Sequence, residues 1–411
     1  MIRQLRIINY RSFEDAEFTL EPLTVFIGPV GAGKSNVLRA IEFLANATWA
    51  RPAEAFGPYP HDFWSVRNRA AKTDSEAIAL EVADAIPRYP EEEATYRIEM
   101  SMGQDGPLIA REVLHRGASG GGPTRTLFDR RLVGGSSDAD PHDAPRIGTQ
   151  LRKASARQPL SDDECFAAHL CDELQLIELY HLEATALRAP SGEGSSRRWA
   201  APGGPGDNTV HSRGALSRSG KGLGAALLSL RDDPGEQAGY EEIVTEMRGL
   251  LPGLRDLILA PTPDGTAVGF QYNGESDYHS AFDESDGTLF TLGLLTIIRQ
   301  SQQPRVLMIE EPETGLHPGR LRWLVDELQD ASDPPDGREP TQVLISTHSP
   351  YVVDELVDMP ECVRVVERVD GRSRVTPLLE VLNKLGISRE ELRDDPIGSR
   401  WCAGLLEGNP V

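Results

Sequence analysis

The segment Gly28–Ser35 has the sequence GPVGAGKS, which fits the spacing G-x-x-x-x-G-K-[ST] of a phosphate-binding loop. Its glycines allow backbone N–H groups to converge on phosphate oxygens, and a helix that begins at the end of the loop adds a partial positive charge. We expect Lys34 to reach the β- and γ-phosphates of ATP and the Ser35 hydroxyl to bind Mg²⁺. The predicted nucleotide contacts of this segment are Gly28, Gly31, Ala32, Gly33, Lys34, Ser35 and Asn36.

Two adjacent acids end an apolar segment much later in the chain. Val306–Ile309 is wholly apolar, and Glu310 and Glu311 follow it directly before Pro312. A carboxylate at the end of a buried strand can hold Mg²⁺, and a second one can orient or deprotonate a water molecule. We therefore predict Glu310 as a metal ligand and Glu311 as the catalytic base. The alternative is an apolar strand that simply ends in solvated acids.

Two further motifs stand where a phosphate could be contacted. His348 follows the apolar segment Val343–Ile345, so we expect it to sense the γ-phosphate by a hydrogen bond. Ser285 and Gly287 open a predicted helix, and such an N-terminus can bind an anion. On chemistry alone, the Ser285 motif is explained equally well as a simple helix cap.

The elements that must position these residues follow from hydrophobic periodicity. The predicted strands are residues 2–8, 16–20, 23–27, 77–83, 95–102, 108–114, 175–179, 254–272, 306–309, 343–345 and a pair within 362–377. The predicted helices are 35–46, 222–231, 236–251, 287–301, 318–331, 350–357 and a helical tail, with most of 161–186 also helical. The stretches 115–160 and 188–222 are rich in Gly, Ser, Pro and Arg and are expected to be long loops. Apolar strands alternating with helices predict an α/β fold with a parallel sheet.

Together, the motifs resemble the SMC/RecF branch of ABC-type ATPases, and in particular bacterial ATPases related to the OLD (overcoming lysogenization defect) family. The resemblance is carried by Ile8–Phe13, Gly28–Ser35, Glu311–Glu313 with Leu316–Pro318, and Ser346–Pro350. It covers residues 1–50 and 280–370 well and the region between them only loosely. It implies a P-loop NTPase of ABC-ATPase (SMC/RecF-like head) type, with an antiparallel β subdomain and a helical, loop-rich insertion.

The resemblance also assigns domains and further site residues. It implies a first ATPase lobe at 1–114, an insertion at 115–275, a second lobe at 276–380 and a helical tail at 381–411. Arg11 joins the expected nucleotide contacts. Ser285-Asp286-Gly287 matches the signature motif, which contacts the γ-phosphate of ATP bound to a second copy. The expected assembly is therefore a homodimer, or a higher even-numbered assembly, that encloses two ATP molecules.

Several positions depart from the family pattern. Val30 stands where many relatives have Asn, and Glu310 stands where Asp is commoner, which lengthens the side chain by one methylene. A glutamine for the so-called Q-loop is not evident, and Gln150 and Gln158 are its candidates. No Toprim-like cluster of acids follows the last motif, since Asp394-Asp395 is expected to be a solvated turn. We therefore expect any nuclease activity to come from a partner.

Composition limits the class of protein. The 411 residues carry a net charge of -22, which argues against coating nucleic acid through the whole surface. The Arg-rich stretches 146–158 and 188–222 are local exceptions, explained either as solvated loops or as nucleic-acid contacts. No run of 18 apolar residues occurs, so no membrane span is expected. Four cysteines without motif spacing fit a reducing cytoplasm.

The function expected from the motifs and the resemblance is that of an ATP-binding and ATP-hydrolysing switch. It would control a separately encoded effector, a Toprim-type nuclease or a toxin encoded nearby, in bacterial anti-phage defence. One alternative is a RecF-like ATPase that acts on duplex DNA in repair or maintenance. Another is the nucleotide-binding subunit of an ABC transporter, although Ser285-Asp286-Gly287 is not the Leu-Ser-Gly-Gly-Gln signature of transporters.

Overall fold

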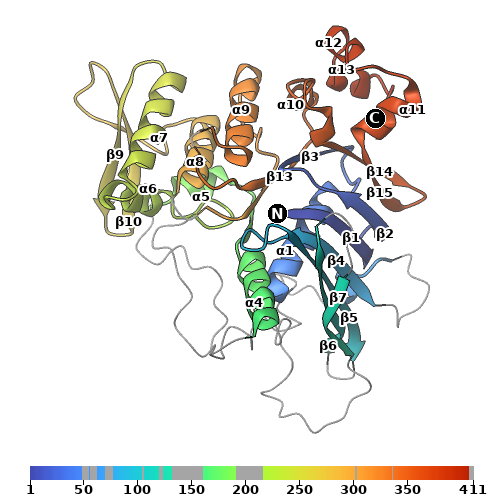
Figure 1. Cartoon of the computed structure of the whole chain (residues 1–411). Helices are drawn as coiled ribbons and strands as arrows, with labels where there is room; N and C mark the ends of the chain where they lie inside the picture. The colour runs from blue at the N-terminus through green and yellow to red at the C-terminus, as the bar shows by residue number, and fades with distance from the viewer. Residues whose placement is uncertain are drawn as a thin grey trace. The chain divides into compact units, whose positions relative to one another are not determined.

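The computed structural model of the chain describes residues 1–48, 55, 63–69, 77–103, 106–119, 124–131, 161–190, 216–300, 303–335 and 337–406. The chain forms two compact units (Figure 1). Unit 1 comprises Met1–Glu178 and Leu328–Val411, and unit 2 comprises Leu179–Glu327. The sequence suggests a different division, into two lobes, an insertion and a tail. Its boundaries are not those of the two units, and it stays a prediction.

An antiparallel sheet forms one part of unit 1. Its strand order is β2-β1-β4-β5-β6-β7. The strands are β1 (Ile2–Tyr10), β2 (Phe13–Thr19), β4 (Ile78–Ala85), β5 (Glu92–Gly103), β6 (Gly106–Ala118) and β7 (Thr124–Arg131). In β5, buried residues alternate with half-buried ones, as expected of a strand with one face against a core. This sheet confirms the antiparallel subdomain predicted from the sequence.

The prediction of a loop at 115–160 is wrong for the part of this stretch that the structure describes. Strand β6 continues to Ala118, and β7 adds a further antiparallel strand at the edge of the sheet (Figure 1). The sequence of β7, TRTLFDRR, has almost no apolar residues to show a period of two. Its pairing relies on polar contacts such as that between Arg111 and Asp129, whose nearest charged atoms are 2.8 Å apart.

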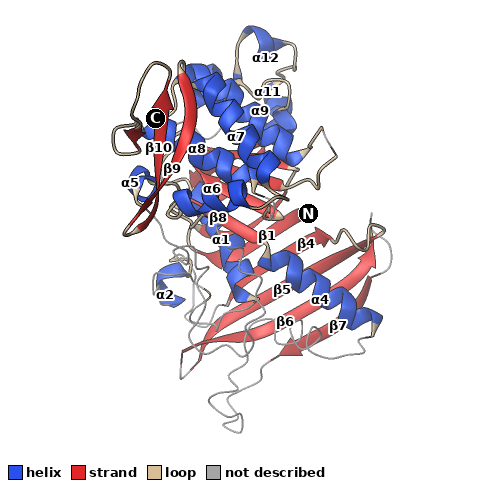
Figure 2. Ribbon diagram, turned by 90° about the vertical axis from the view of Figure 1, so that its left-hand side faces the viewer, coloured by secondary structure: helices blue, strands red, loops and turns tan. Residues whose placement is uncertain are grey.

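Helix α4 (Asp162–Gln175) crosses strands β5 and β6 of this sheet (Figure 2). Ser161 begins it with a capping box, in which the side chains of Ser161 and Glu164 bind each other's backbone N–H groups. Arg116 of β6 ties the helix to the sheet, because it pairs with Asp162 and Asp163 in the first turn. The same guanidinium lies over the ring of Phe166, 4.7 Å from its centre.

Four strands of unit 1 lie side by side in the order β15-β14-β3-β13 and position the phosphate-binding loop. They are β3 (Leu23–Ile27), β13 (Gln342–Thr347), β14 (Val363–Val369) and β15 (Arg372–Pro377). Strands β13 and β14 both run parallel to β3, and every residue of β3 and β13 is buried. This is the buried parallel arrangement that the apolar strands predict.

The remaining elements of unit 1 are helical. Helix α1 (Lys34–Ala47) follows β3 and buries the predicted face of Val37, Leu38, Ile41 and Leu44. The short helix α2 (Phe63–Val66) precedes the antiparallel strand β4. The chain ends in α10 (Pro350–Asp354), a 3₁₀ turn at Pro360–Cys362, α11 (Leu378–Leu385), α12 (Glu391–Asp394) and α13 (Ile397–Cys402). Helices α10 and α13 touch closely, since the Gly398 N–H donates to Asp354 over 2.6 Å.

Unit 2 contains a group of three packed helices and a small antiparallel sheet. Helices α6 (Leu223–Asp232), α7 (Gln237–Leu250) and α8 (Asp286–Arg299) pack on one another, and β9 (Leu254–Thr262), β10 (Gly265–Tyr272) and β11 (His279–Ser280) form the sheet. The unit also holds α5 (Ala184–Arg188), the buried strand β12 (Val306–Glu310) beside β8 (Ile177–Tyr180), and a 3₁₀ turn at Pro318–Arg320. The chain leaves it through α9 (Leu321–Ser332). Apart from β11, for which no strand was predicted, these helices and strands agree with the predicted ones to within a few residues.

Candidate functional site

The phosphate-binding loop has the backbone conformation that its glycines predict. Gly28 has a φ of 153° and Gly33 a φ of 116°. Residues other than glycine rarely adopt such positive φ angles. There is also no room for a side chain. A Cβ atom on Gly28 would lie 2.0 Å from the Val366 carbonyl oxygen, and one on Gly33 would lie 2.4 Å from the Ser373 hydroxyl. The hairpin of β14 and β15 therefore supports the loop from one side.

Lys34 is held by the loop and by the neighbouring strand. Its side chain is 4% exposed. The ammonium donates to the carbonyl oxygens of Gly28 over 2.7 Å and Pro29 over 3.1 Å. It also lies 3.1 Å from Nδ1 of His348, which follows β13. Because an ammonium can only donate, Nδ1 accepts this hydrogen bond and a neutral His348 ring carries its hydrogen on Nε2. The structure thus brings Lys34 and His348 together.

The turn between β1 and β2 adds a second support. The Ser12 carbonyl accepts from the Ser373 N–H over 2.8 Å, and the Ser12 hydroxyl accepts from the Asn36 amide over 2.8 Å. Arg11 has a φ of 49°, and its N–H donates to the Val66 carbonyl over 2.6 Å. The Asn36 side chain therefore contacts Ser12, while nucleotide contacts of Asn36 and Arg11 stay predictions. Ser35 is half-buried at the first turn of α1.

The two acids of unit 2 differ in conformation. Glu310 is the last residue of β12 and is 8% exposed. Glu311 has a φ of 49°, which is uncommon for a residue with a side chain, and its carbonyl accepts from the Thr314 N–H over 3.0 Å. Strained backbone of this kind is concentrated at functional sites. The turn therefore ends strand β12 between the two acids.

The signature-like loop lies against the loop that follows Glu311. Ser285 caps α8, since its hydroxyl accepts from the Thr288 N–H over 3.1 Å. A Cβ atom on Gly287 would lie 2.3 Å from the Gly315 carbonyl oxygen. Arg188 of α5 holds the same loop by donating to the Glu284 carbonyl over 2.9 Å and to Asp286 over 2.6 Å. Within unit 2, the two motifs therefore form one block.

Replacing Gly287 by alanine is expected to destabilise unit 2 by about 1–3 kcal/mol, because the added methyl group overlaps a backbone oxygen that cannot move freely. The change should also weaken any ATP-dependent self-association. Gly249 in α7 provides a matched control, since a Cβ atom there meets nothing within 4 Å. Alanine at Gly249 is expected to be neutral or to stabilise by a few tenths of a kcal/mol. Urea unfolding of both variants checks the difference, and equal stabilities would contradict the close contact.

Three residues of these two groups were not predicted from the sequence. They are His181, whose Nδ1 lies 3.4 Å from Oε2 of Glu310, and the supporting residues Arg188 and Ser373. A signal for His181 was present, because it directly follows the largely buried strand β8 just as His348 follows β13. The supporting residues carry no such signal. Gln150, Gln158 and the Arg-rich stretch 146–158 lie outside the described residues, as does most of 188–222.

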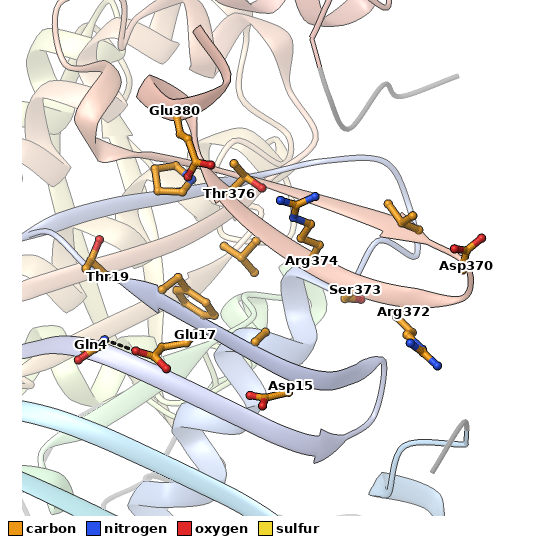
Figure 3. A pocket seen from close by; sticks show the side chains of 15 residues that line it. Gln4, Asp15, Glu17, Thr19, Asp370, Arg372, Ser373, Arg374, Thr376 and Glu380 are labelled. Carbon is orange, nitrogen blue, oxygen red and sulfur yellow. Dashed lines mark hydrogen bonds between the residues drawn. The ribbon is translucent and has the colours of Figure 1, made fainter. Parts of the chain in front are cut away.

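A pocket of about 710 Å³ lies elsewhere in unit 1, between strands β2 and β15 (Figure 3). Asp15 and Glu17 approach it from β2, and Arg374 and Thr376 from β15. A hydrogen bond from Arg6 holds the pKa of Asp15 below its usual value. None of the residues from Gly28 to Asn36 lines the pocket, so it is separate from the phosphate-binding loop.

Comparison with known proteins decides the family. A profile of the family described as "AAA domain, putative AbiEii toxin, Type IV TA system" matches residues 23–354, which is most of the chain. The chain belongs to this family. The match of this AAA-domain family contains the phosphate-binding loop, the two acids and His348, and it establishes an ATPase-type P-loop fold. It confirms the α/β fold class predicted from the sequence.

Two curated relatives are similar to this AAA-domain protein. The OLD nuclease of Thermus scotoductus is 25% identical over 91% of the chain, and the chain spans 63% of that protein's length, less than two thirds. The DNA replication and repair protein RecF of Corynebacterium jeikeium is 44% identical over 46 residues, 11% of each chain. The family match and the OLD nuclease similarity confirm the predicted resemblance to SMC/OLD-like ABC-type ATPases.

Solved structures of SMC heads are also similar. The SMC head domain from Thermotoga maritima is 13% identical with a TM-score of 0.46, over 92% of this chain and 98% of that chain. An SMC head bound to the C-winged helix domain of ScpA is 14% identical with a TM-score of 0.49, over 91% and 97%. These likenesses are too distant to bear on function. Among the described residues, no helix is both long and apolar enough to cross a bilayer.

Proposed function

We propose that this chain binds and hydrolyses ATP and that the cycle acts as a molecular switch. The observation that carries the proposal is the contact between Lys34, which follows the loop after β3, and His348, which directly follows the adjacent parallel strand β13. The ammonium of Lys34 and the Nε2–H of a neutral His348 ring are hydrogen-bond donors on two side chains that contact each other. Such donors suit the terminal phosphate of a nucleoside triphosphate, because hydrogen bonds from charged groups to phosphate are strong.

Mg²⁺ bound with the nucleotide neutralises negative charge on the phosphates. Ser35 and Glu310 would hold it, and both offer the oxygen donors that Mg²⁺ prefers. Among the described residues, no three or more His, Cys, Asp or Glu side chains form a group that could hold a metal ion. Mg²⁺ at nucleotide sites needs no such group, because waters and phosphate oxygens supply most of its ligands. The oxygen donors of Ser35 and Glu310 are therefore of the chemical type that supports a magnesium–nucleotide complex.

Glu311 would act as the general base on the water that attacks the γ-phosphate. In the proposed active form, its carboxylate orients that water and accepts its proton. Glu310 would be a ligand of the cation and would take no part in this proton transfer. Glu310 ends β12, while Glu311 has the left-handed conformation of the turn that follows, and we propose that the two adjacent acids have different roles.

The proposed active form is a two-fold homodimer. The N-terminus of α8 offers the Ser285 hydroxyl and backbone N–H groups to an anion, and we propose that it contacts the γ-phosphate of ATP held by the second copy. An isologous interface would then enclose two ATP molecules. ATP would stabilise the closed dimer, and hydrolysis would release it.

The output of the switch is proposed from the relatives. Similarity to an OLD nuclease, together with the family description that names a toxin, supports a role beside a nuclease or toxin in anti-phage defence. We propose that a Toprim-type nuclease or a toxin encoded nearby is the effector, and that the chain works in the cytoplasm. The similarity to RecF favours, as a second candidate, an ATPase that acts on duplex DNA through its Arg-rich stretches.

One set of measurements tests the proposal. The purified chain with Mg²⁺ and ATP should release phosphate, and light scattering should show the mass doubling with ATP and not with ADP. Duplex DNA should leave hydrolysis unchanged if the chain controls a protein effector. Stimulation by duplex DNA that disappears at high salt would favour the second candidate. A chain that neither binds nor hydrolyses ATP would refute both.

A further inference from the structure

Glu310 has one more rotatable bond than the aspartate that is commoner at this position. A longer carboxylate reaches further, but it also has more side-chain conformations, of which few direct an oxygen at a metal ion. A buried strand end alone does not select among them. The site therefore needs a group that fixes the Glu310 carboxylate, and this need arises only if Glu310 holds the cation of the proposed function.

His181 is placed to be that group. Its Nδ1 lies 3.4 Å from Oε2 of Glu310, while the Glu310 side chain is 7% exposed and the His181 side chain 50% exposed. The residue follows β8, the neighbour of β12, so the ring and the carboxylate leave adjacent strands at the same edge. An ionised carboxylate can only accept, so Nδ1 of a neutral ring carries the hydrogen in this contact.

The backbone of His181 is itself anchored. Its N–H donates to the Arg218 carbonyl over 2.9 Å, and the N–H of Glu183 donates to the Ser219 carbonyl over 2.9 Å. Leu182 and Leu187 of the same segment pack against Gly220 and Gly293. A Cβ atom placed on Gly220 would lie 2.6 Å from Leu187, and one placed on Gly293 would lie 2.9 Å from it. The ring is therefore carried by a segment that is held at several points.

We propose that His181 is a positioning residue, which holds the Glu310 carboxylate in the conformation that binds the metal ion of the nucleotide complex. It acts through Glu310 and touches neither nucleotide nor metal. The pairing of a histidine N–H with a metal-binding carboxylate is an outer-shell contact of the kind whose loss weakens metal affinity about 10–100-fold. The inference rests on the proposed function and adds to it a residue that compensates for the longer acid.

The test measures how ATP affinity depends on Mg²⁺, by titrating a fluorescent ATP analogue with Mg²⁺ and in EDTA. His181→Ala should raise the Mg²⁺ concentration for half-maximal binding about 10-fold or more and leave binding in EDTA unchanged. His181→Asn should retain the parental value, because its amide N–H stands where Nδ1–H stands. His279→Ala is the matched control, since His279 is also half-exposed and paired with a glutamate of unit 2, at 2.8 Å, and should change nothing.

A shorter acid separates positioning from a general structural role. In Glu310→Asp the carboxylate no longer reaches His181, so adding His181→Ala should have no further effect on the Mg²⁺ dependence. An equal loss in both backgrounds, an unchanged Mg²⁺ dependence of His181→Ala, or weaker binding in EDTA would each overturn the inference. A parental chain that binds no nucleotide under any condition would overturn the proposed function, and the inference with it.

Discussion

Replacing Lys34 by alanine is expected to abolish ATP binding. The Lys34 ammonium donates to a carbonyl oxygen of the loop, and Lys34 is almost fully buried. Charge-assisted hydrogen bonds contribute about 1.5–3 kcal/mol each, so losing two contacts to phosphate weakens binding by at least about a hundredfold. Isothermal titration with Mg²⁺ and ATP measures the loss, and hydrolysis should disappear with it.

Lys384→Ala is the control for this prediction. Lys384 is half-exposed on α11 of the same unit and pairs only with Glu380 one helical turn away, at 3.0 Å. Its loss should leave ATP affinity unchanged. Thermal unfolding of Lys34→Ala is needed beside it, because the substitution also removes a donor from the carbonyls of Gly28 and Pro29. A folded Lys34→Ala variant with parental ATP affinity would contradict the assignment of the phosphate-binding loop.

The local site could be predicted from the sequence because each motif carries its own physical signal. Gly28 and Gly33 have left-handed backbone where the spacing requires it, and His348 reaches Lys34 because β3 and β13 are parallel neighbours. Parallel neighbours bring the residues that follow them to one edge of a sheet. The apolar stretches within these strands predicted a buried parallel sheet, but not which strands are neighbours in it. The family match confirms the fold that these motifs indicate.

What the sequence did not predict depends on long-range contacts. Strand β7 lacks apolar alternation and exists because β6 offers it an edge and charged partners. Ser373 supports the phosphate-binding loop from some 340 residues away, by hydrogen bonds of its hydroxyl to Ala32 and of its N–H to Ser12. A serine in an exposed-looking hairpin gives no local sign of such a role. A polar residue that directly follows a buried strand is a candidate site residue. The same rule, applied to β8, would have identified His181.

Replacing Glu311 by glutamine is expected to separate ATP binding from hydrolysis. Glutamine keeps the size and polarity of the side chain but cannot accept a proton from water. Loss of a general base lowers the rate by about 10²–10⁴-fold, which single-turnover phosphate release measures. ATP affinity should stay near the parental value, since Lys34 and the loop are intact. With hydrolysis blocked, the ATP-bound dimer should accumulate, and light scattering should show the doubled mass persisting for as long as ATP is present.

Two variants show whether the loss of hydrolysis in Glu311→Gln is caused by the missing carboxylate or by a change in the strained backbone. Glu311→Gly relieves the left-handed conformation, at φ 49°, and also removes the base, so it should lose hydrolysis to the same extent. Glu275→Gln changes a half-exposed glutamate of unit 2 and should behave like the parental chain. If Glu311→Gln hydrolyses ATP at the parental rate, Glu311 is not the base. In that case the left-handed turn after β12 serves only to end the strand and to place Gly315 against Gly287, and the attacking water must be activated by a residue outside this pair of acids.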